Sequence, residues 1–539
     1  MGVRWLTPPL ALVVLAVLIP VSASGHAERD AYFPDHKLGK VPKYRTTGPS
    51  LVVCKSDSAK RIARMGGAGR KARAARRHNL ALVDRCRYSH IQQAVNAADN
   101  RTRILVLPGV YKEEPSRRVP KDPAECRGDK YGDETSDART YEFHRDCPNA
   151  QNLIAIVGDD ADADRRCDDK CNLQIEGTGL RPQDVKVVGG GYGLKPGAKL
   201  NLFRADRADG IVLRNFLVQY SDFNNIYVLE TNGFRVQDVL SRWSREYGVL
   251  TFTSDNGLYA NVTAYGSGDS GIYPGSGPEG HCGRYGIEVR YSESYGNTIG
   301  WSGTAGNGVY THHSKFHHNS AGITMDSFAG GHPGMPQDCS KWVSNQIYSN
   351  NADLFNDKRD AYCKNTPPEQ RDPRKVCPTF QVPVGTGILT GGGNGNIFKK
   401  NWIYDNWRRG TMLFWVPGEL RGEDTTGQSA PNRTYETSHN NKYIANRMGF
   451  RPSGRRDPNG VDFWWDEEGH GNCWSANKGP RGGAFTSDPT PLFACPKGSP
   501  NGTGSTEKQG SLFVCATWHP IDNPDPVGCD WFTRPREPR

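Results

Sequence analysis

The chain has few of the features that mark a compact globular enzyme or a membrane protein. Only 36% of its 539 residues are hydrophobic, and after residue 24 no apolar run is long enough to span a bilayer. Glycine and proline are plentiful, at 62 and 36 residues, but glycine has no strict three-residue period, which excludes collagen. This composition favours an elongated repeat array over a single deep core.

Residues 1–24 predict a secretory signal, because Arg4 precedes the apolar stretch 10–21 and small residues follow at 21–23. All 14 cysteines come after this segment. An even number of cysteines in an exported protein favours disulfides over a metal site or a catalytic thiol. Cys167 and Cys171 have a zinc-like spacing but no second pair nearby. We therefore expect a secreted, disulfide-bonded protein that has no membrane span and does not bind nucleic acid.

Internal repeats predict the fold. Residues 257–271 align without a gap on 308–322, and 286–300 (GIEVRYSESYGNTIG) has the same glycine-to-glycine spacing. Successive units begin 29 and 22 residues apart. Each holds a short alternating strand, an aromatic residue, a small residue or Asn at a turn, and a second strand. A period in the twenties that is built from strands and turns predicts a β-solenoid.

The entry to this array carries a recognisable pattern. Apolar residues at 91, 94, 95 and 98 form one face of a short helix over 89–99, and a strand at 103–107 leads into Pro108-Gly-Val-Tyr111. This pattern resembles the start of right-handed parallel β-helix proteins of the pectin-lyase type. The resemblance implies an all-β, right-handed parallel β-helix over 86–450, with the helix capping its N-terminal end. Repeated aromatic and Asn residues near the turns predict an internal aromatic stack and an Asn ladder.

Segments outside the repeats complete the predicted organisation. Residues 25–85 are expected to be an irregular basic extension, and the tail 451–539, rich in Cys, Trp, Gly and Pro, a disulfide-tied cap. Insertions are expected at 112–175, 327–341 and 357–383, the last two as loops that overhang one face. The run 60–78 holds eight Lys and Arg and no acid. It fits either attraction to a polyanion or a solvated extension.

One acidic stretch has the opening spacing of a calcium loop. Asp160, Asp162 and Asp164 place carboxylates at alternate positions, but no turn glycine follows and no Glu closes the loop. Calcium is the one cofactor that the sequence suggests, and a solvated acidic turn is the alternative.

Alignment of the repeats by their glycines predicts a catalytic face. It places Asn261, Arg290 and His312 at equivalent positions in adjacent coils, and Asp326 beyond the following turn. His312 would be a base, Arg290 would hold a carboxylate and Asp326 would be the accompanying acid. The alternative is a solvated face with a histidine stack.

Further residues are predicted to contact a substrate. Tyr273 and Trp301, in a second row with Thr324, would stack on sugar rings. His281 and Arg284 are additional substrate-binding candidates, and so is His332 in the overhanging loop.

The resemblance implies action on, or binding to, an extracellular polysaccharide. A lyase or a C5-epimerase of a uronate-containing polymer fits the β-helix type, and the partner would be an acidic polysaccharide or a cell-wall polymer. The chain lacks the Asp-Pro-His-Asp-His motif of periplasmic mannuronan epimerases and a paired-Asp pattern of the polygalacturonase type. Two alternatives stay open: a non-catalytic carbohydrate- or wall-binding module, and a structural surface solenoid.

Overall fold

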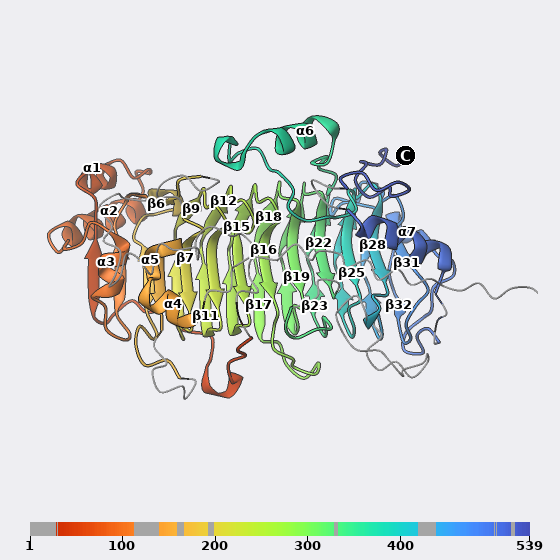
Figure 1. The fold of residues 1–539 in the computed structure, drawn as a ribbon, viewed down its shortest axis with the longest axis horizontal. Helices are drawn as coiled ribbons and strands as arrows, with labels where there is room; N and C mark the ends of the chain where they lie inside the picture. The colour runs from red at the N-terminus through yellow and green to blue at the C-terminus, as the bar shows by residue number, and fades with distance from the viewer. Residues whose placement is uncertain are drawn as a thin grey trace, which may run out of the picture.

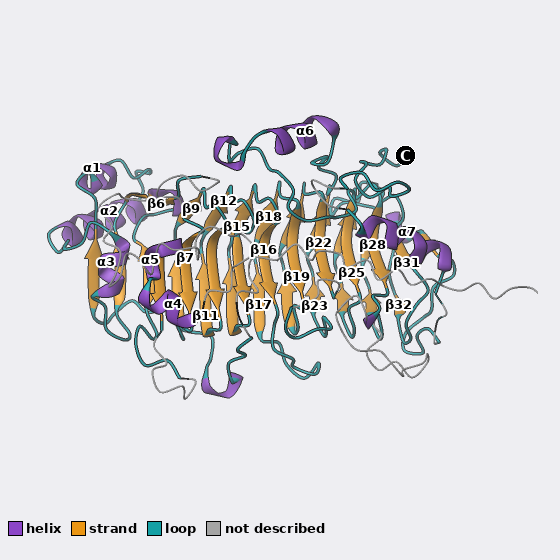
Figure 2. Ribbon diagram, in the orientation of Figure 1, coloured by secondary structure: helices purple, strands orange, loops and turns teal. Residues whose placement is uncertain are grey.

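Three long sheets, parallel throughout, form the body of the protein (Figures 1 and 2). The computed structural model describes residues 29, 31–112, 140–158, 166–191, 199–327, 332–418, 438–500, 502, 504–518 and 523–539. The chain visits sheets A, B and C in turn and then begins the next coil, so each sheet gains one strand per coil. This is the right-handed parallel β-helix that the sequence predicts.

The strands are short, and those of sheet C are mostly the longest. Sheet A contains β1 Ser50–Val53, β2 Arg103–Val106, β5 Gln174–Gly177, β8 Ile211–Arg214, β11 Asn232–Gln237, β14 Asp255–Ala260, β17 Ile287–Arg290, β20 Val309–His312, β23 Lys341–Val343, β26 Ile397–Lys399, β29 Lys442–Ile444 and β32 Cys473–Ser475. Sheet B contains β3 Gly109–Lys112, β6 Val185–Val188, β9 Leu217–Gln219, β12 Leu240–Arg242, β15 Thr263–Tyr265, β18 Glu293–Tyr295, β21 Lys315–His317, β24 Gln346–Tyr348, β27 Trp402–Tyr404 and β30 Arg447–Met448. Sheet C contains β4 Asn152–Val157, β7 Asn201–Asp206, β10 Asn224–Leu229, β13 Val249–Phe252, β16 Ser270–Gly275, β19 Ile299–Thr304, β22 Ala321–Asp326, β25 Thr386–Gly391, β28 Arg409–Phe414, β31 Phe463–Trp465 and β33 Ser487–Asp488.

Asparagine ladders hold the corners between sheets. At the corner from B to C, each Nδ2 donates to the Oδ1 of the next coil's Asn at 3.0 Å, a chain that runs through Asn297, Asn319, Asn350, Asn406 and Asn459. Similar chains occupy the other two corners, through Asn345, Asn401, Asn446 and Asn477 and through Asn396, Asn441 and Asn472. The predicted Asn ladder is confirmed. Its amides satisfy buried backbone groups where the chain leaves the sheets.

The predicted aromatic stack is divided between two surfaces. Tyr443 is internal, as expected, and stacks on Phe398 at 4.7 Å between ring centroids. Other rings form a row on the outer face of sheet B, because each occupies the same outward position of successive strands. The stacked members of this row are Tyr265, Tyr295, His317, Tyr348 and Tyr404, at spacings of 4.7 to 5.3 Å.

The N-terminal end is more ordered than the sequence suggests. Strand β1 joins sheet A, and the basic run forms helices α1 Ser58–Ala63 and α2 Arg70–Val83 instead of an irregular extension. They pack on the first coil through Ile62, Met65 and Leu82. The predicted cap is α3 Ile91–Asn96, whose Ile91, Ala94 and Val95 join the main core.

The other described helices lie at corners and at the C-terminal end. They are α4 Tyr141–Asp146, α5 Pro148–Gln151, α6 Asp357–Asn365 and α7 Thr506–Ala516. Insertion 357–383 carries α6, which overhangs the β-helix as predicted (Figure 1). The tail lays α7 against the outer face of sheet C, where Leu512 packs with Phe414 and Trp464. The solenoid also continues into this tail, because β31, β32 and β33 extend the sheets past residue 450.

Disulfides staple the loops and the tail. The described pairs are Cys54–Cys86, Cys167–Cys171, Cys282–Cys339, Cys363–Cys377, Cys473–Cys495 and Cys515–Cys529. Cys147 is also disulfide-bonded, and none of the described cysteines is free. Pairing of Cys167 with Cys171 removes the zinc alternative for these two residues. Among the described residues, no helix is both long and apolar enough to cross a bilayer.

Candidate functional site

Two of the predicted catalytic residues are neighbours on the outer face of sheet A. Arg290 and His312 are register partners on β17 and β20, as the repeat alignment predicts. Asn261 does not belong to this row, because Ala260 pairs with Arg290. The carboxylate of Glu288 lies between the two candidates: its Oε1 is 3.0 Å from Nη1 of Arg290 and 2.9 Å from Nε2 of His312.

The hydrogen bonds of His312 leave it badly placed to act as a base. Its Nε2 contacts Glu288, and its Nδ1 lies 2.8 Å from Nδ1 of His313. A base needs a ring nitrogen that can reach the substrate proton. Arg290 likewise already binds a carboxylate of the protein itself. This group fits a surface hydrogen-bond network better than a catalytic site.

Asp326 and Tyr273 lie on a different face, the outside of sheet C. The expectation that Arg290, His312 and Asp326 converge is therefore not met. Strand residues alternate between the core and the outer face, and Tyr273 on β16 and Asp326 on β22 both point outward. Both are almost completely buried in the folded chain.

The insertion 327–341 brings a histidine to this face. His332 lies with Nε2 at 3.3 Å from the hydroxyl oxygen of Tyr273, and its ring packs edge-on against Phe252. The hydroxyl of Thr304 donates to Asp326, at 2.9 Å from Oδ1 and 3.1 Å from Oδ2. Three adjacent strands and one loop thus gather an imidazole, a phenol, a hydroxyl and a carboxylate.

Two further titratable groups adjoin them. The rings of Tyr247 and Tyr273 are 4.9 Å apart, and Asp269 lies at the corner that leads into β16. We call Tyr247, Asp269, Tyr273, Thr304, Asp326 and His332 the sheet C cluster. In sequence, Asp269 stands near a predicted turn and Tyr247 shows no motif, so only the fold reveals them as members.

Burial governs the electrostatics of the sheet C cluster. It raises the pKa of the Asp269 carboxyl well above its usual value, and the nearby charges of Glu246 and Asp326 raise it further. Burial, reinforced by the Asp326 carboxylate, likewise raises the pKa of the Tyr273 phenol. Within the described structure, Oδ1 of Asp269 is buried without a hydrogen-bond partner. Titratable groups perturbed in this way concentrate at functional sites.

Trp301 belongs to the hydrophobic core. Its register partners are Ile272 and Ile323, which also point inward, and its ring packs edge-on against Trp342 at 4.6 Å. The outward neighbour on the same strand is Ser302, whose hydroxyl is 3.4 Å from that of Thr324. Because one residue's shift in a strand reverses the face, the predicted stacking row of Tyr273, Trp301 and Thr324 contains Ser302 in place of the tryptophan.

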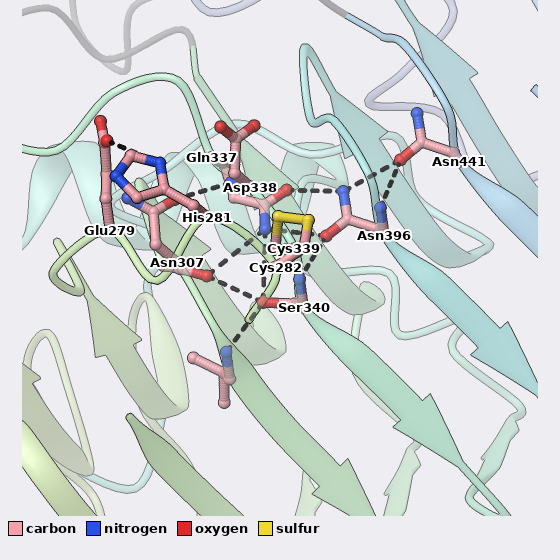
Figure 3. The surroundings of a disulfide bond; sticks show 12 residues. Glu279, His281, Cys282, Asn307, Gln337, Asp338, Cys339, Ser340, Asn396 and Asn441 are labelled. Carbon is pink, nitrogen blue, oxygen red and sulfur yellow. Dashed lines mark hydrogen bonds and ion pairs between the residues drawn. A yellow bond between two sulfur atoms is a disulfide. The ribbon is translucent and has the colours of Figure 1, made fainter. Parts of the chain in front are cut away.

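His281 and Arg284 lie in the loop between β16 and β17, at the corner from C to A. Figure 3 shows His281 beside the Cys282–Cys339 disulfide, pointing toward Glu279, whose Oε2 is 3.7 Å from its Nδ1. The His281 side chain is 86% exposed. Arg284 pairs with the buried carboxylate of Asp255. Neither residue contacts the sheet C cluster through a described hydrogen bond or ion pair.

The predicted calcium ligands Asp160, Asp162 and Asp164 fall outside the described residues. In the part of the chain that is described, no three His, Cys, Asp or Glu side chains gather so as to hold a metal ion.

Comparisons with solved structures give matches of low sequence identity. The chain is similar to pectate lyase Pel9A, with 11% identity, a TM-score of 0.36 and coverage of 82% of this chain and 79% of the lyase. It is also similar to the A-module of the Azotobacter vinelandii mannuronan C-5 epimerase AlgE6, at 12% identity and a TM-score of 0.30 over 72% and 94% of the two chains. PfbA, a surface adhesin of Streptococcus pneumoniae, gives 9% identity and a TM-score of 0.38 over 80% and 90%. No protein-family model and no curated protein sequence matches the chain.

Proposed function

We propose that the protein is a secreted polysaccharide lyase that acts on a uronate-containing polymer through the sheet C cluster. The observation that carries the proposal is the contact of 3.3 Å between the Tyr273 hydroxyl and Nε2 of His332, on a face that also holds Asp269 and Asp326. The pair offers an acid and a base to one substrate. The raised pKa keeps the phenol protonated, and the imidazole can accept a proton.

The geometry favours elimination over epimerisation. In elimination, His332 takes the proton from C5 of the uronate, the C4–O4 bond breaks as the C4–C5 double bond forms, and Tyr273 protonates the departing oxygen. An acid and a base that touch each other act from the same side of the sugar. Epimerisation must return the proton to the opposite face of C5, which a touching pair does not serve.

Asp269 has the properties needed at the substrate carboxylate. Charge grows on this carboxylate as the C5 proton leaves, and a donor placed there stabilises the transition state. A buried acid with a raised pKa keeps its proton and can donate a hydrogen bond. Calcium bound together with the substrate could neutralise the same charge, so the assay includes conditions with and without it.

Hydrolysis is the second candidate, because two carboxyl groups on one face differ in environment. Asp269 is held protonated by burial and would be the general acid, while Asp326, bonded to the Thr304 hydroxyl, would be the base. Paired carboxyls with different proton affinities are what glycoside hydrolysis requires.

The basic N-terminal helices support an acidic polymer as the partner. Arg70, Lys71, Arg73 and Arg77 of α2 are exposed at the end of the solenoid. A cluster of cations attracts a polyanion and raises its local concentration. The alternative for this basic run is a solvated, irregular extension. These residues instead lie on a helix that packs against the β-helix.

The test is an activity screen of the secreted chain without residues 1–24. The cluster is buried in the folded chain, so a substrate reaches it only if part of its cover moves. The chain without residues 1–24 is assayed because it is the form left after the predicted signal cleavage. Alginate, pectate, hyaluronan and heparan-type polymers are incubated with and without calcium. Ultraviolet absorbance detects the double bond of elimination, a reducing-end assay detects hydrolysis, and NMR detects epimerised residues.

Variants then locate the chemistry. Elimination should be lost in His332→Ala and strongly reduced in Tyr273→Phe, and it should persist in the matched control His312→Ala. New reducing ends without a double bond, lost in Asp269→Asn, would establish hydrolysis instead. Equal activity of the wild type and His332→Ala would refute the assignment. Retention of a polymer without any turnover would support the non-catalytic binding alternative.

A further inference from the structure

A second surface feature lies on sheet B, away from the sheet C cluster. A shallow groove of about 520 Å³ crosses strands β12, β15 and β18. This volume is within the range of sites that hold small ligands. Its lining residues are Pro182, Gln183, Asp238, Val239, Leu240, Arg242, Asn261, Thr263, Tyr265 and Tyr295.

The lining combines apolar and polar side chains. Pro182 and Leu240 contribute apolar surface that suits the C–H face of a sugar ring. Gln183, Asn261 and Thr263 contribute amides and a hydroxyl, which can both donate and accept hydrogen bonds with sugar hydroxyls.

Arg242 gives the groove a positive charge. Its guanidinium donates to Gln219 Oε1 at 2.7 Å and to the Tyr265 hydroxyl at 2.9 Å, and it lies 4.0 Å from the centre of the Trp243 ring. These partners are neutral. Among the described residues, no carboxylate forms an ion pair with Arg242.

The one acid in the lining does not cancel this charge. Asp238 is paired with Arg214, whose Nε is 3.0 Å from Oδ2, and its Oδ1 accepts from Asn261 at 3.0 Å. Since Arg214 neutralises Asp238, the guanidinium of Arg242 remains available to an anionic group. A guanidinium binds a carboxylate or a sulfate through charge-assisted hydrogen bonds.

The aromatic row continues from this groove along the axis. Tyr265 and Tyr295 begin the stack, 4.9 Å apart and with ring planes 16° from parallel. Stacked rings cover each other's faces, so the row presents ring edges and hydroxyls rather than platforms for sugar stacking. The same outward position thus carries an aromatic residue in successive coils, and a linear polymer lying along the axis would meet these residues in turn.

We propose that the sheet B groove is a non-catalytic binding site for an acidic oligosaccharide. One anionic group of the sugar binds Arg242, the ring lies over Leu240, and its hydroxyls bond to Asn261 and Gln183. The proposal stands apart from the lyase assignment, because the groove and the sheet C cluster share no residue.

The experiment is a calorimetric titration of the mature chain with short oligouronates. A neutral cello-oligosaccharide of equal length serves as the ligand control. Arg242→Ala should weaken binding about tenfold or more, which corresponds to about 1.4 kcal/mol, and higher salt should weaken the wild type. Tyr265→Phe removes one hydroxyl and keeps the ring stack, so it should bind more weakly than the wild type while folding normally.

The matched control is Arg447→Ala. This arginine is on the same sheet, lies over Trp402 at 5.0 Å and is outside the groove, so its removal should leave affinity unchanged. Binding that is absent in the wild type, equal for the neutral sugar, or insensitive to both Arg242→Ala and Tyr265→Phe would overturn the proposal. His332→Ala should retain binding, which separates a failure of this site from a failure of the lyase assignment.

Discussion

Removal of one ladder amide should destabilise the β-helix strongly. Asn350 is fully buried in the middle of its ladder. Its Nδ2 donates to Asn406 Oδ1 at 3.0 Å and to the Phe316 carbonyl at 3.2 Å, and its Oδ1 accepts from Nδ2 and N of Asn319 at 3.0 and 3.3 Å. Substitution by Ala removes these four hydrogen bonds. At about 1 kcal/mol for each bond, we expect a loss of roughly 3–5 kcal/mol in unfolding free energy.

The assay is urea unfolding followed by far-ultraviolet circular dichroism, with hydrogen exchange of the flanking coils. Hydrogen exchange is needed because a long repeat array can open locally before it unfolds as a whole. The matched control is Asn365→Ala, at an exposed position that ends α6, which should change stability by less than about 0.5 kcal/mol. A loss below about 1 kcal/mol for Asn350→Ala, with unchanged exchange in its neighbours, would refute the ladder's structural role.

Three further predictions follow from the core, a half-buried histidine and a disulfide. Trp301→Ala should cost roughly 3–5 kcal/mol of unfolding free energy, as for other buried aromatic residues, and should leave polymer affinity unchanged; weaker binding at full stability would restore it as a sugar contact. Burial lowers the pKa of His317 in the folded protein. The unfolded chain therefore binds a proton at this residue more readily than the folded protein does, so the free energy of unfolding is unaffected by His317 above its unfolded pKa of about 6.5 and falls as the pH drops below that value. His317→Gln should flatten the pH dependence of thermal unfolding in that range, and an unchanged curve would contradict this. Loss of the Cys54–Cys86 disulfide, which joins residues 32 apart, should cost about 3–4 kcal/mol in the double Cys→Ala variant, measured by urea unfolding; a loss under 1 kcal/mol would argue against it.

The fold could be predicted from the sequence because the residues that each coil requires recur along the chain. Each coil needs an inward apolar column and a polar residue at each corner, so the pattern returns wherever the chain starts a new coil. The cap helix could also be predicted, because Ile91, Ala94 and Val95 lie on one face at helical spacing. The basic helices were missed because Lys and Arg occupy five of the 14 positions of α2, and its contacts with the first coil involve only a few side chains.

The candidate site was only partly predictable. Tyr273 and Asp326 lie on one face as alternating strand positions, which the repeats do indicate. His332 lies in an irregular loop, 59 residues from Tyr273 in the sequence. Such a loop has no repeat pattern, so the sequence does not predict which face of the β-helix it contacts. The length of the coils also varies through the loop that ends at Gly286, so an alignment by glycine slips by one residue: Gly257 pairs with Ile287. A slip of one residue exchanges the inside and outside of a strand, and this slip explains why Asn261 falls outside the row of Arg290 and His312. Trp301 stands 15 residues after Gly286, just as the inward Ile272 stands 15 residues after Gly257, so its place in the outward row belongs to Ser302, one residue further on.

The hydrogen-bond contacts of His312 on sheet A and His317 on sheet B follow one repeated pattern, and those of His332 at sheet C do not belong to it. His312 contacts His313 and Glu288, and five residues later His317 contacts His318 through Nδ1, at 2.7 Å, and Glu293 through Nε2, at 3.1 Å. The same three-group arrangement thus appears twice, at the two sides of one corner. A reaction centre needs one arrangement at one place, whereas a device that holds a corner is useful at every coil. The repeated networks are therefore explained by the solenoid itself, and the proposed chemistry rests on the contact between Tyr273 and His332 instead.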